Sequence, residues 1–334
     1  MEYEKLGDTD INVSKICVGC MSFGLRGSMH DWSLDEKTSD KMINYALDNG
    51  INFFDTANGY SKGTSEEYLG NSLRGNVDRE DVVIASKVYF NPGRLSMDAI
   101  NREIDLSLER LQTDYLDLYI IHRFDYNTPI EETMEALNGL VESGKVRSIG
   151  ASAMYAYQFY NMQILAKDNG WAKFQAMENH YSLIYREDER DMIPVCEEMN
   201  VSLMPYSPLA AGHLTRPKWK SDTLRGRTDK VAMGKYDRME NYDIKIIERV
   251  KEVADSYACN MSEVALAWQW KKGVTSPIIG ATKIEHFDEA INALSLKLTD
   301  DDIEYLEELY VAHPVVGAIK ENPPEGVILL DEKK

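Results

Sequence analysis

The chain has 334 residues and is 43% hydrophobic, which is typical of a globular protein and excludes a fibrous or disordered class. Its net charge of −19, from 56 acidic and 37 basic residues, argues against a nucleic-acid partner, because so acidic a chain repels a phosphate backbone. No apolar run approaches the ~20 residues of a membrane span, and the first residues carry no secretory signal pattern, so we expect a cytoplasmic protein without a membrane partner.

Short apolar runs alternate with longer amphipathic stretches, which predicts strands alternating with helices. The predicted strands cover residues 16–18, 51–54, 82–85, 116–121, 146–151, 174–177, 201–204 and 277–279. The predicted helices cover residues 38–49, 65–74, 97–111, 129–143, 157–168, 187–199, 243–257 and 262–272. Consecutive parallel strands need helical crossovers, and eight such units in this length favour a closed α/β TIM (β/α)8 barrel over an open doubly wound sheet.

Three segments lie outside this repeat. Residues 1–13 carry turn signals and are expected to form a hairpin that closes the bottom of the barrel. A long loop rich in basic and polar residues follows the seventh strand at 206–240, and a proline-containing tail covers 311–334. We therefore expect a single domain over residues 1–334, with the barrel at about 14–310.

Two of the four cysteines, Cys17 and Cys20, have the spacing of a metal-binding pair. No second pair or nearby histidine completes a zinc site. We interpret them as buried thiols and predict no metal.

The residues that follow the predicted strands carry the chemistry, because the active sites of TIM barrels collect at the carboxyl ends of their strands. Asp55, Lys87 and His122 end the second, third and fourth strands, and Tyr60 lies in the loop five residues beyond Asp55. The later strands end at Ser152, Glu178, Tyr206 and Thr282.

These four residue types together suit the reduction of a carbonyl group. We expect Lys87 to lower the pKa of the Tyr60 phenol, so that Tyr60 can act as general acid. Asp55 would keep Lys87 charged, and His122 would hydrogen-bond the substrate oxygen. The group contains no nucleophile and no metal cage, so a hydride must come from a nicotinamide cofactor.

Other barrel chemistries fit less well. A metal-dependent hydrolase needs several histidine or carboxylate ligands, whereas His122 is the only histidine directly at a strand end. A Schiff-base aldolase using Lys87 stays open as the second enzymatic interpretation, although Asp55 would oppose the deprotonation that it requires.

Several segments together resemble the aldo/keto reductase family. They are DTANGY at 55–60, ASKV at 85–88, DLYIIHR at 117–123, GKVRSIGAS at 144–152 and YSPL at 206–209. The resemblance extends over about residues 4–316, and residues 179–187 are similar to the bacterial general aldehyde reductases near the potassium-channel β subunits.

The resemblance implies a catalytic tetrad of Asp55, Tyr60, Lys87 and His122 and an extended NADP(H) across the barrel mouth. It places Ser152 and Glu178 beside the nicotinamide carboxamide and stacks Tyr206 on the ring. The implied cofactor-binding residues are Gly19, Met21, Ser152, Glu178, Tyr206, Ser207, Leu209, Gly212, Leu214, Thr282, Lys283, His286 and Glu289.

The sequence departs from the family pattern at the cofactor. Glu178 and Ala153 stand where the family usually has Gln and Asn, and Ala290 stands at another usual Asn. His286 occupies a place that Arg often holds. Lys283 is the cation that favours NADPH, since the 2′-phosphate needs a positive partner.

The substrate pocket is expected to contain Phe23, Trp32, Tyr89 and Arg123. The aromatic side chains suit a planar or apolar carbonyl compound, while Arg123 could instead hold a carboxylate or phosphate. The sequence therefore predicts NADPH-dependent reduction of aldehydes or ketones to alcohols. The alternative class is a cofactor-binding regulatory subunit with negligible turnover, and the sequence does not indicate the oligomeric state.

Overall fold

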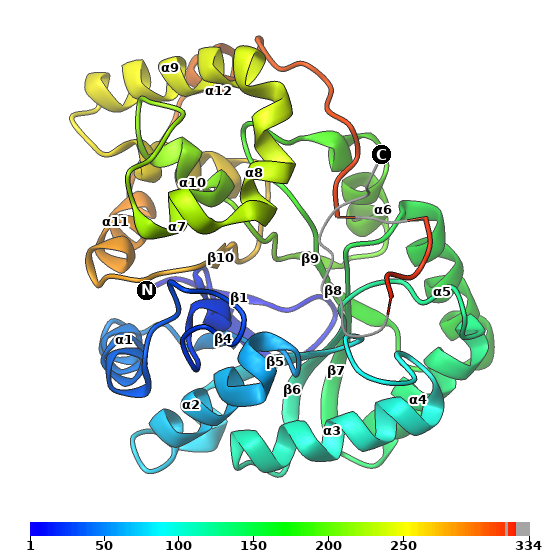
Figure 1. The fold of residues 1–334 in the computed structure, drawn as a ribbon. Coiled ribbons are helices and arrows are strands. Elements are labelled where there is room, and N and C mark those ends of the chain that lie inside the picture. Colours follow the sequence, from blue (N-terminus) through cyan, green and yellow to red (C-terminus); the bar gives the residue numbers. More distant parts are fainter. Residues whose placement is uncertain (318–319, 325–334) are drawn as a thin grey trace.

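A computed structural model describes residues 1–317 and 320–324. Eight parallel strands form one curved sheet in which chain neighbours are also spatial neighbours, and the last strand pairs with the first (Figure 1). The strands are β3 (Cys17–Gly19), β4 (Phe53–Asp55), β5 (Val83–Val88), β6 (Leu116–Ile121), β7 (Val146–Ser152), β8 (Phe174–Glu178), β9 (Ser202–Leu203) and β10 (Ile278–Ile279).

Backbone hydrogen bonds join the two ends of this sheet. Thr275 N donates to Leu203 O and Ile278 N donates to Pro205 O, both at 3.0 Å. The residues beside β9 and β10 thus complete the ring, and the predicted TIM barrel is confirmed.

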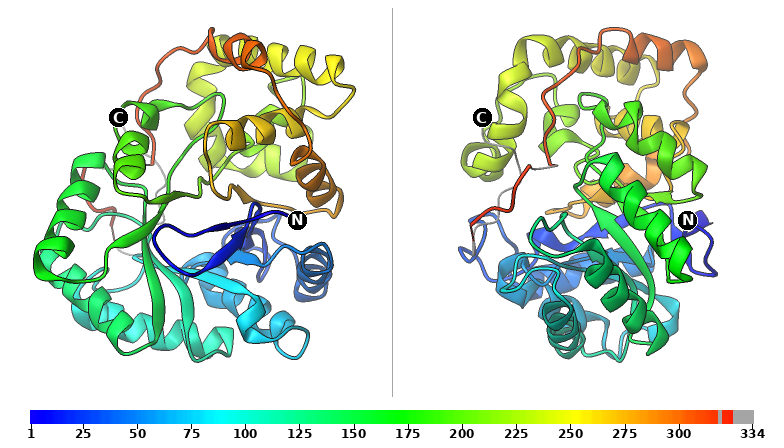
Figure 2. Two further views of the ribbon diagram at one scale, coloured as in Figure 1. Left: turned by 180° about the vertical axis from the view of Figure 1, so that it is seen from behind. Right: turned by 90° about the vertical axis from the view of Figure 1, so that its right-hand side faces the viewer.

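Helices surround the strands on the outside (Figures 1 and 2). They are α1 (Glu36–Asp48), α2 (Thr64–Leu73), α3 (Met97–Leu111), α4 (Ile130–Glu142), α5 (Ala156–Asn169), α6 (Met192–Glu198), α9 (Glu240–Ser256), α10 (Met261–Lys271), α11 (Glu285–Ala293) and α12 (Asp300–Glu307). Helix α3 coincides with its predicted range because Ser96 caps its start and its apolar residues recur at helical spacing. No helix in the described ranges is long and apolar enough to cross a bilayer.

Two predicted elements differ from the observed ones. The helix predicted over 187–199 is divided into a short 3-10 turn, η4 (Glu187–Arg190), and α6, because Asp191 has non-helical dihedrals and its carboxylate caps Met192 N. The long loop at 206–240 contains the helices α7 (Leu224–Thr228) and α8 (Lys230–Tyr236). Helix α7 buries no residue, so its sequence has no apolar stripe to predict it.

A hairpin of β1 (Tyr3–Lys5) and β2 (Asn12–Ser14) closes the amino-terminal end of the barrel, as predicted. Leu6, Ile11 and Val13 join the apolar cluster that fills the barrel interior. The turn fits closely because Gly7 has φ +55°, and an added Cβ would lie 2.7 Å from the carbonyl of Gln175. The interior is thereby sealed at the end opposite the predicted site.

The four cysteines are free, and Cys17 and Cys20 are buried, as predicted. The described residues contain no group of His, Cys, Asp and Glu that could hold a metal ion. Residues 311–317 and 320–324 form no helix or strand, and the rest of the predicted tail, at 318–319 and 325–334, lies outside the described residues.

Candidate active site

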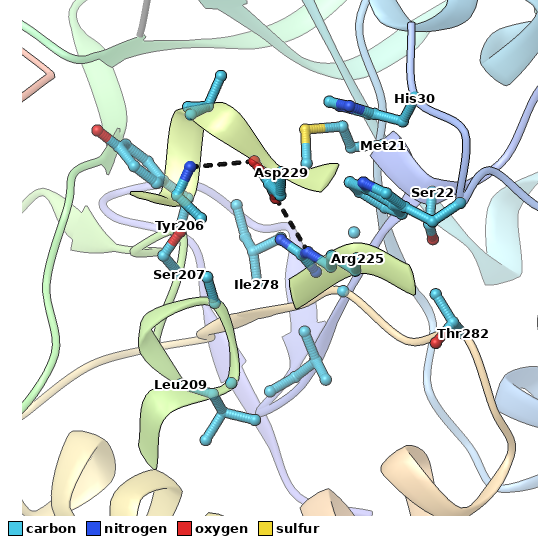
Figure 3. A pocket seen from close by; sticks show the side chains of 18 of the residues that line it. Met21, Ser22, His30, Tyr206, Ser207, Leu209, Arg225, Asp229, Ile278 and Thr282 are labelled. Atoms are coloured by element: carbon cyan, nitrogen blue, oxygen red, sulfur yellow. Dashed lines mark hydrogen bonds and ion pairs between the residues drawn. The ribbon is translucent and has the colours of Figure 1, made fainter. Parts of the chain in front are cut away.

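A cavity of about 630 Å³ opens at the carboxyl ends of the barrel strands. Its walls come from strand ends, from the loop after β3, and from α7 and α8 (Figure 3). Most of the predicted site residues line it, among them Asp55, Tyr60 and His122.

Lys87 lies behind the cavity wall, at the centre of a buried polar group. Its fully buried ammonium lies 2.6 Å from both carboxylate oxygens of Asp55 and 2.9 Å from the carbonyl oxygen of Thr56. Burial alone would lower the pKa of Lys87, but the carboxylates of Asp55 and Glu178 raise it well above its usual value. Lys87 therefore stays an ammonium, which disfavours the Schiff-base aldolase.

Tyr60 lies beside this ammonium, with its hydroxyl oxygen 3.4 Å from Lys87 Nζ. The next three residues, Ser61, Lys62 and Gly63, all have positive φ, so the chain turns sharply after Tyr60. This turn holds the phenol against the cavity wall while the backbone continues into α2.

The expected direction of the Tyr60 pKa is wrong. Burial raises the pKa of Tyr60 well above its ordinary value, and the nearby charge of Lys87 only partly opposes this, since Asp55 and Glu178 raise it further. Tyr60 is thus a protonated phenol, with an ammonium directed at its oxygen. It can donate a hydrogen bond and is ready to give its proton where an alkoxide forms.

His122 follows β6 and completes the predicted group. Its ring makes an edge contact with that of Tyr60, with centroids 5.7 Å apart, and another with Phe90 at 5.0 Å. Burial, followed by the charges of Lys87 and Arg123, lowers the pKa of His122 well below its usual value. A neutral imidazole at the mouth can hydrogen-bond an oxygen in the cavity without carrying charge.

Glu178, at the end of β8, is a second carboxyl group beside the same ammonium. Its Oε2 lies 3.3 Å from Lys87 Nζ, and its side chain is 3% exposed. Burial, and then the charge of Asp55, raises the pKa of Glu178 to about 8, with Lys87 opposing the shift. Burial also raises the pKa of Asp55, with Lys87 opposing the shift, so the two carboxyl groups compete for one ammonium. The raised pKa of Glu178 favours its protonated form, which can donate a hydrogen bond as the amide of a glutamine would.

The residues predicted to bind a cofactor line the cavity, with the exception of Leu214. The lining ones are Gly19, Met21, Ser152, Glu178, Tyr206, Ser207, Leu209, Gly212, Thr282, Lys283, His286 and Glu289. Leu214 is fully buried in the apolar core between barrel and helices, because the chain turns inward after Gly212.

Tyr206 presents a flat ring to the cavity from the loop after β9 (Figure 3). His180 is stacked parallel to it, with centroids 5.1 Å apart, and Tyr185 is stacked on the same imidazole at 4.1 Å. Lys235 Nζ lies 4.6 Å from the centroid of Tyr206. The ring is therefore supported by a column of aromatic side chains.

The backbone beyond Tyr206 is strained. Ser207, Ala210, Ala211 and Gly212 all have positive φ, which is uncommon for residues other than glycine. Such left-handed residues allow a tight turn that directs backbone N–H groups to one side, and Ser207, Ala211 and Gly212 line the cavity. Strain of this kind clusters at functional sites.

Basic side chains surround the cavity in spite of the acidic composition. Besides the predicted Arg123 and Lys283, the lining includes Arg26, Arg216, Arg225 and Lys235, which the sequence analysis missed. Arg225 lies 3.2 Å from Asp229 and its guanidinium carbon lies 4.4 Å from the centroid of Trp32 (Figure 3). It thus joins α7 to the loop after β3 across the mouth, in a cavity that suits an anionic ligand.

The segment predicted to bind a 2′-phosphate lies at one end of the cavity. Lys283 and His286 line it just before and inside the first turn of α11. Burial lowers the pKa of His286, with Lys283 and Arg225 contributing in the same direction, so its imidazole is neutral and Lys283 supplies the charge.

The predicted substrate pocket needs two corrections. Trp32 and Arg123 line the cavity, but Phe23 and Tyr89 do not. Phe23 is fully buried in the core between barrel and helices. The hydroxyl of Tyr89 instead bonds Asn322 at 3.1 Å beneath the C-terminal tail, and the next residue, Phe90, takes the place on the cavity wall.

Tail residues pack against this side of the mouth. Asn322 donates to Asp125 Oδ1 at 2.6 Å and accepts from the backbone N–H of Tyr126 at 3.1 Å. Arg123 donates to the carbonyl of Gly317. The tail is thereby fastened to the loop after β6, which carries His122.

Comparisons with known proteins agree with this geometry. The family profile described as the aldo/keto reductase family matches residues 15–311. A versiconal hemiacetal acetate reductase of Aspergillus parasiticus is 43% identical, over 93% of this chain and 97% of its own length. A Schizosaccharomyces pombe protein that is named, provisionally, an aryl-alcohol dehydrogenase is 41% identical. The match covers 95% of this chain and 98% of the length of that protein. The crystal structure of a thermostable aldo-keto reductase, Tm1743, with the inhibitor epalrestat aligns with a TM-score of 0.76 at 27% identity, covering 92% of this chain and all of that one.

Proposed function

The chain belongs to the aldo/keto reductase family, and from this premise we propose that it is an oxidoreductase that reduces aldehydes or ketones to alcohols with NADPH. The observation that carries the proposal is the contact of the buried Lys87 Nζ with Asp55 at 2.6 Å and with Tyr60 Oη at 3.4 Å, since Asp55 and Tyr60 line the cavity. A family of this kind uses a nicotinamide cofactor, which supplies the hydride when bound.

In this proposal Tyr60 is the general acid. A carbonyl oxygen placed between Tyr60 and the neutral imidazole of His122 would accept hydrogen bonds from both. As negative charge develops on that oxygen, the proton of Tyr60 moves to it, and the ammonium of Lys87 stabilises the phenolate that remains. Asp55 acts through Lys87, because two short contacts fix the position of the ammonium.

The residues present fit a phosphorylated dinucleotide. The flat ring of Tyr206 offers a stacking surface, and the left-handed turn that includes Ser207 and Gly212 lines the cavity where a pyrophosphate would bind. Lys283 would pair with the 2′-phosphate, which supports NADPH over NADH. Gly19, Met21, Ser152, Leu209, Thr282, His286 and Glu289 are proposed as further cofactor contacts because they line the same cavity.

Aromatic aldehydes are the proposed substrate class. Tyr60, His122 and Phe90 form a chain of edge contacts at the cavity wall, and Trp32 lies in the wall as well. Flat rings pack well against such edges and faces. The provisional name of the Schizosaccharomyces pombe relative supports the same class.

The predicted membership of the branch of bacterial general aldehyde reductases stays a prediction, because the two relatives named above on sequence identity are fungal. A cytoplasmic location is likewise a prediction.

The test is NADPH oxidation with a panel of aromatic and short-chain aldehydes. Tyr60→Phe should lower kcat by about 100-fold or more, because a positioned general acid contributes that much. NADPH binding, followed by fluorescence, should be retained in the variant. Turnover that survives Tyr60→Phe would remove the acid assignment, and cofactor binding without turnover on any carbonyl would favour the regulatory subunit.

A further inference from the structure

Glu178 is a buried carboxyl group for which the proposed chemistry has no use. It ends β8, lines the cavity and is 2% exposed. Its Oε2 contacts Lys87 Nζ at 3.3 Å, at the edge of the cavity that Glu178 lines. A carboxyl group in the wall of a cavity is placed to contact a ligand bound there.

The charges around Glu178 do not balance. Lys87 is the single ammonium in contact, and both oxygens of Asp55 lie closer to it, at 2.6 Å. The other titratable groups that influence this pair are Tyr60 on the loop after β4, Cys17 on β3 and Cys20 directly after β3, and each is neutral because burial raises its pKa. His122, after β6, is neutral too. If Asp55 and Glu178 were both ionised, one negative charge would be buried without compensation.

Because of this charge imbalance, the site should interact differently with the reduced and the oxidised nicotinamide ring. The reduced ring is neutral, whereas the oxidised ring carries one positive charge. A protonated Glu178 suits the neutral ring and can donate a hydrogen bond to it, whereas an ionised Glu178 would restore charge balance only beside the cation.

We propose that Glu178 determines, through its own ionisation, how strongly the site prefers oxidised over reduced cofactor at a given pH. The inference rests on the proposed function, because it requires a nicotinamide ring in this part of the cavity. Binding of NADP⁺ releases the proton of Glu178 to solvent, whereas binding of NADPH leaves the proton in place. The affinity for NADP⁺ relative to NADPH should therefore rise with pH up to the pKa of Glu178, by at most about tenfold per pH unit.

Calorimetric titration of the whole protein in buffers of different ionisation enthalpy tests this directly, because it counts the protons released on binding. At pH 7, NADP⁺ should release up to about one proton more than NADPH does. The proton release measured with NADPH is subtracted from that measured with NADP⁺. This removes the protons that the 2′-phosphate and His286 exchange, because they exchange them with either form of the cofactor. In Glu178→Gln the difference should disappear, while both cofactor forms still bind.

Glu197→Gln is the matched control. Glu197 is exposed on α6 and does not line the cavity, so its loss should leave the proton difference intact. Equal proton release by the two forms in the wild type, or a difference that persists in Glu178→Gln, would overturn the role of Glu178 and leave the proposed function standing. If neither form binds, the proposed function fails, and this inference fails with it.

Discussion

The imidazole of His180 lies parallel to the ring of Tyr206, with an interplanar angle of 5° and centroids 5.1 Å apart. The same imidazole is 2.8 Å, through Nε2, from the hydroxyl of Tyr236 at the end of α8. One buried side chain therefore supports the stacking surface of the cavity and contacts a helix that covers the mouth.

This relationship predicts that His180 positions Tyr206. His180→Ala removes the support and should weaken NADPH binding by about tenfold, the equivalent of one lost aromatic stacking contact. His180→Phe keeps a flat ring and should restore most of the affinity in a fluorescence titration. If the phenylalanine variant binds as weakly as the alanine variant, the contact with Tyr236 rather than the stacking is what matters.

Lys283 is predicted to set the preference between the two dinucleotides. Lys283→Ala should weaken NADPH binding by roughly tenfold while leaving NADH binding nearly unchanged, because only NADPH carries a 2′-phosphate for the ammonium. Lys297→Ala removes an exposed ammonium outside the cavity and serves as the charge control. Equal loss of affinity for both dinucleotides would contradict the assignment.

Phe90 is predicted to favour aromatic substrates. Phe90→Ala should raise KM for an aromatic aldehyde several-fold more than KM for a short-chain one, since it removes an apolar wall beside His122. Tyr89→Phe, which loses only the hydroxyl that bonds Asn322, is the neighbouring control and should change neither value greatly. An equal change in KM for both substrates would show that the aromatic ring of the substrate does not contact Phe90.

The raised pKa of Glu178, about 8, predicts how stability varies with pH. Between the ordinary glutamate pKa and 8 the folded protein keeps a proton that the unfolded chain has released. The free energy of unfolding therefore falls as pH rises through this range, by at most about 1.4 kcal/mol per pH unit from this group. The contribution is fully present below the ordinary pKa and is lost as pH rises through 8.

Glu178→Gln should flatten this dependence in urea unfolding measured from pH 5 to pH 8. Glu197→Gln, at an exposed position on α6, should leave the slope as in the wild type. A slope that is unchanged in Glu178→Gln would show that Glu178 ionises normally in the folded protein.

The fold and the centre of the site could be predicted because strands end where apolar runs end. Asp55, Lys87 and His122 follow such runs, and parallel strands in a barrel bring their ends together. The direction in which the pKa of Tyr60 shifts could not be predicted. The shift depends on how completely the folded site removes water from the phenol, and the order of residues does not show this.

The parts of the site that were missed lie beyond the strands. Tyr89 and Phe90 are adjacent aromatic residues after β5, and only the path of the loop decides which one reaches the cavity. Arg225 and Lys235 lie on α7 and α8, whose short sequences bury too few apolar residues to produce a periodic pattern.

The hairpin that fills the bottom of the barrel has a consequence for proton supply. Leu6, Ile11 and Val13 block the amino-terminal end, so the mouth is the open side from which water approaches the buried Lys87. Tyr60, which is 8% exposed, stands on that route. A ligand that fills the mouth therefore isolates the acid from solvent, and each proton given up inside must be replaced after the mouth has emptied.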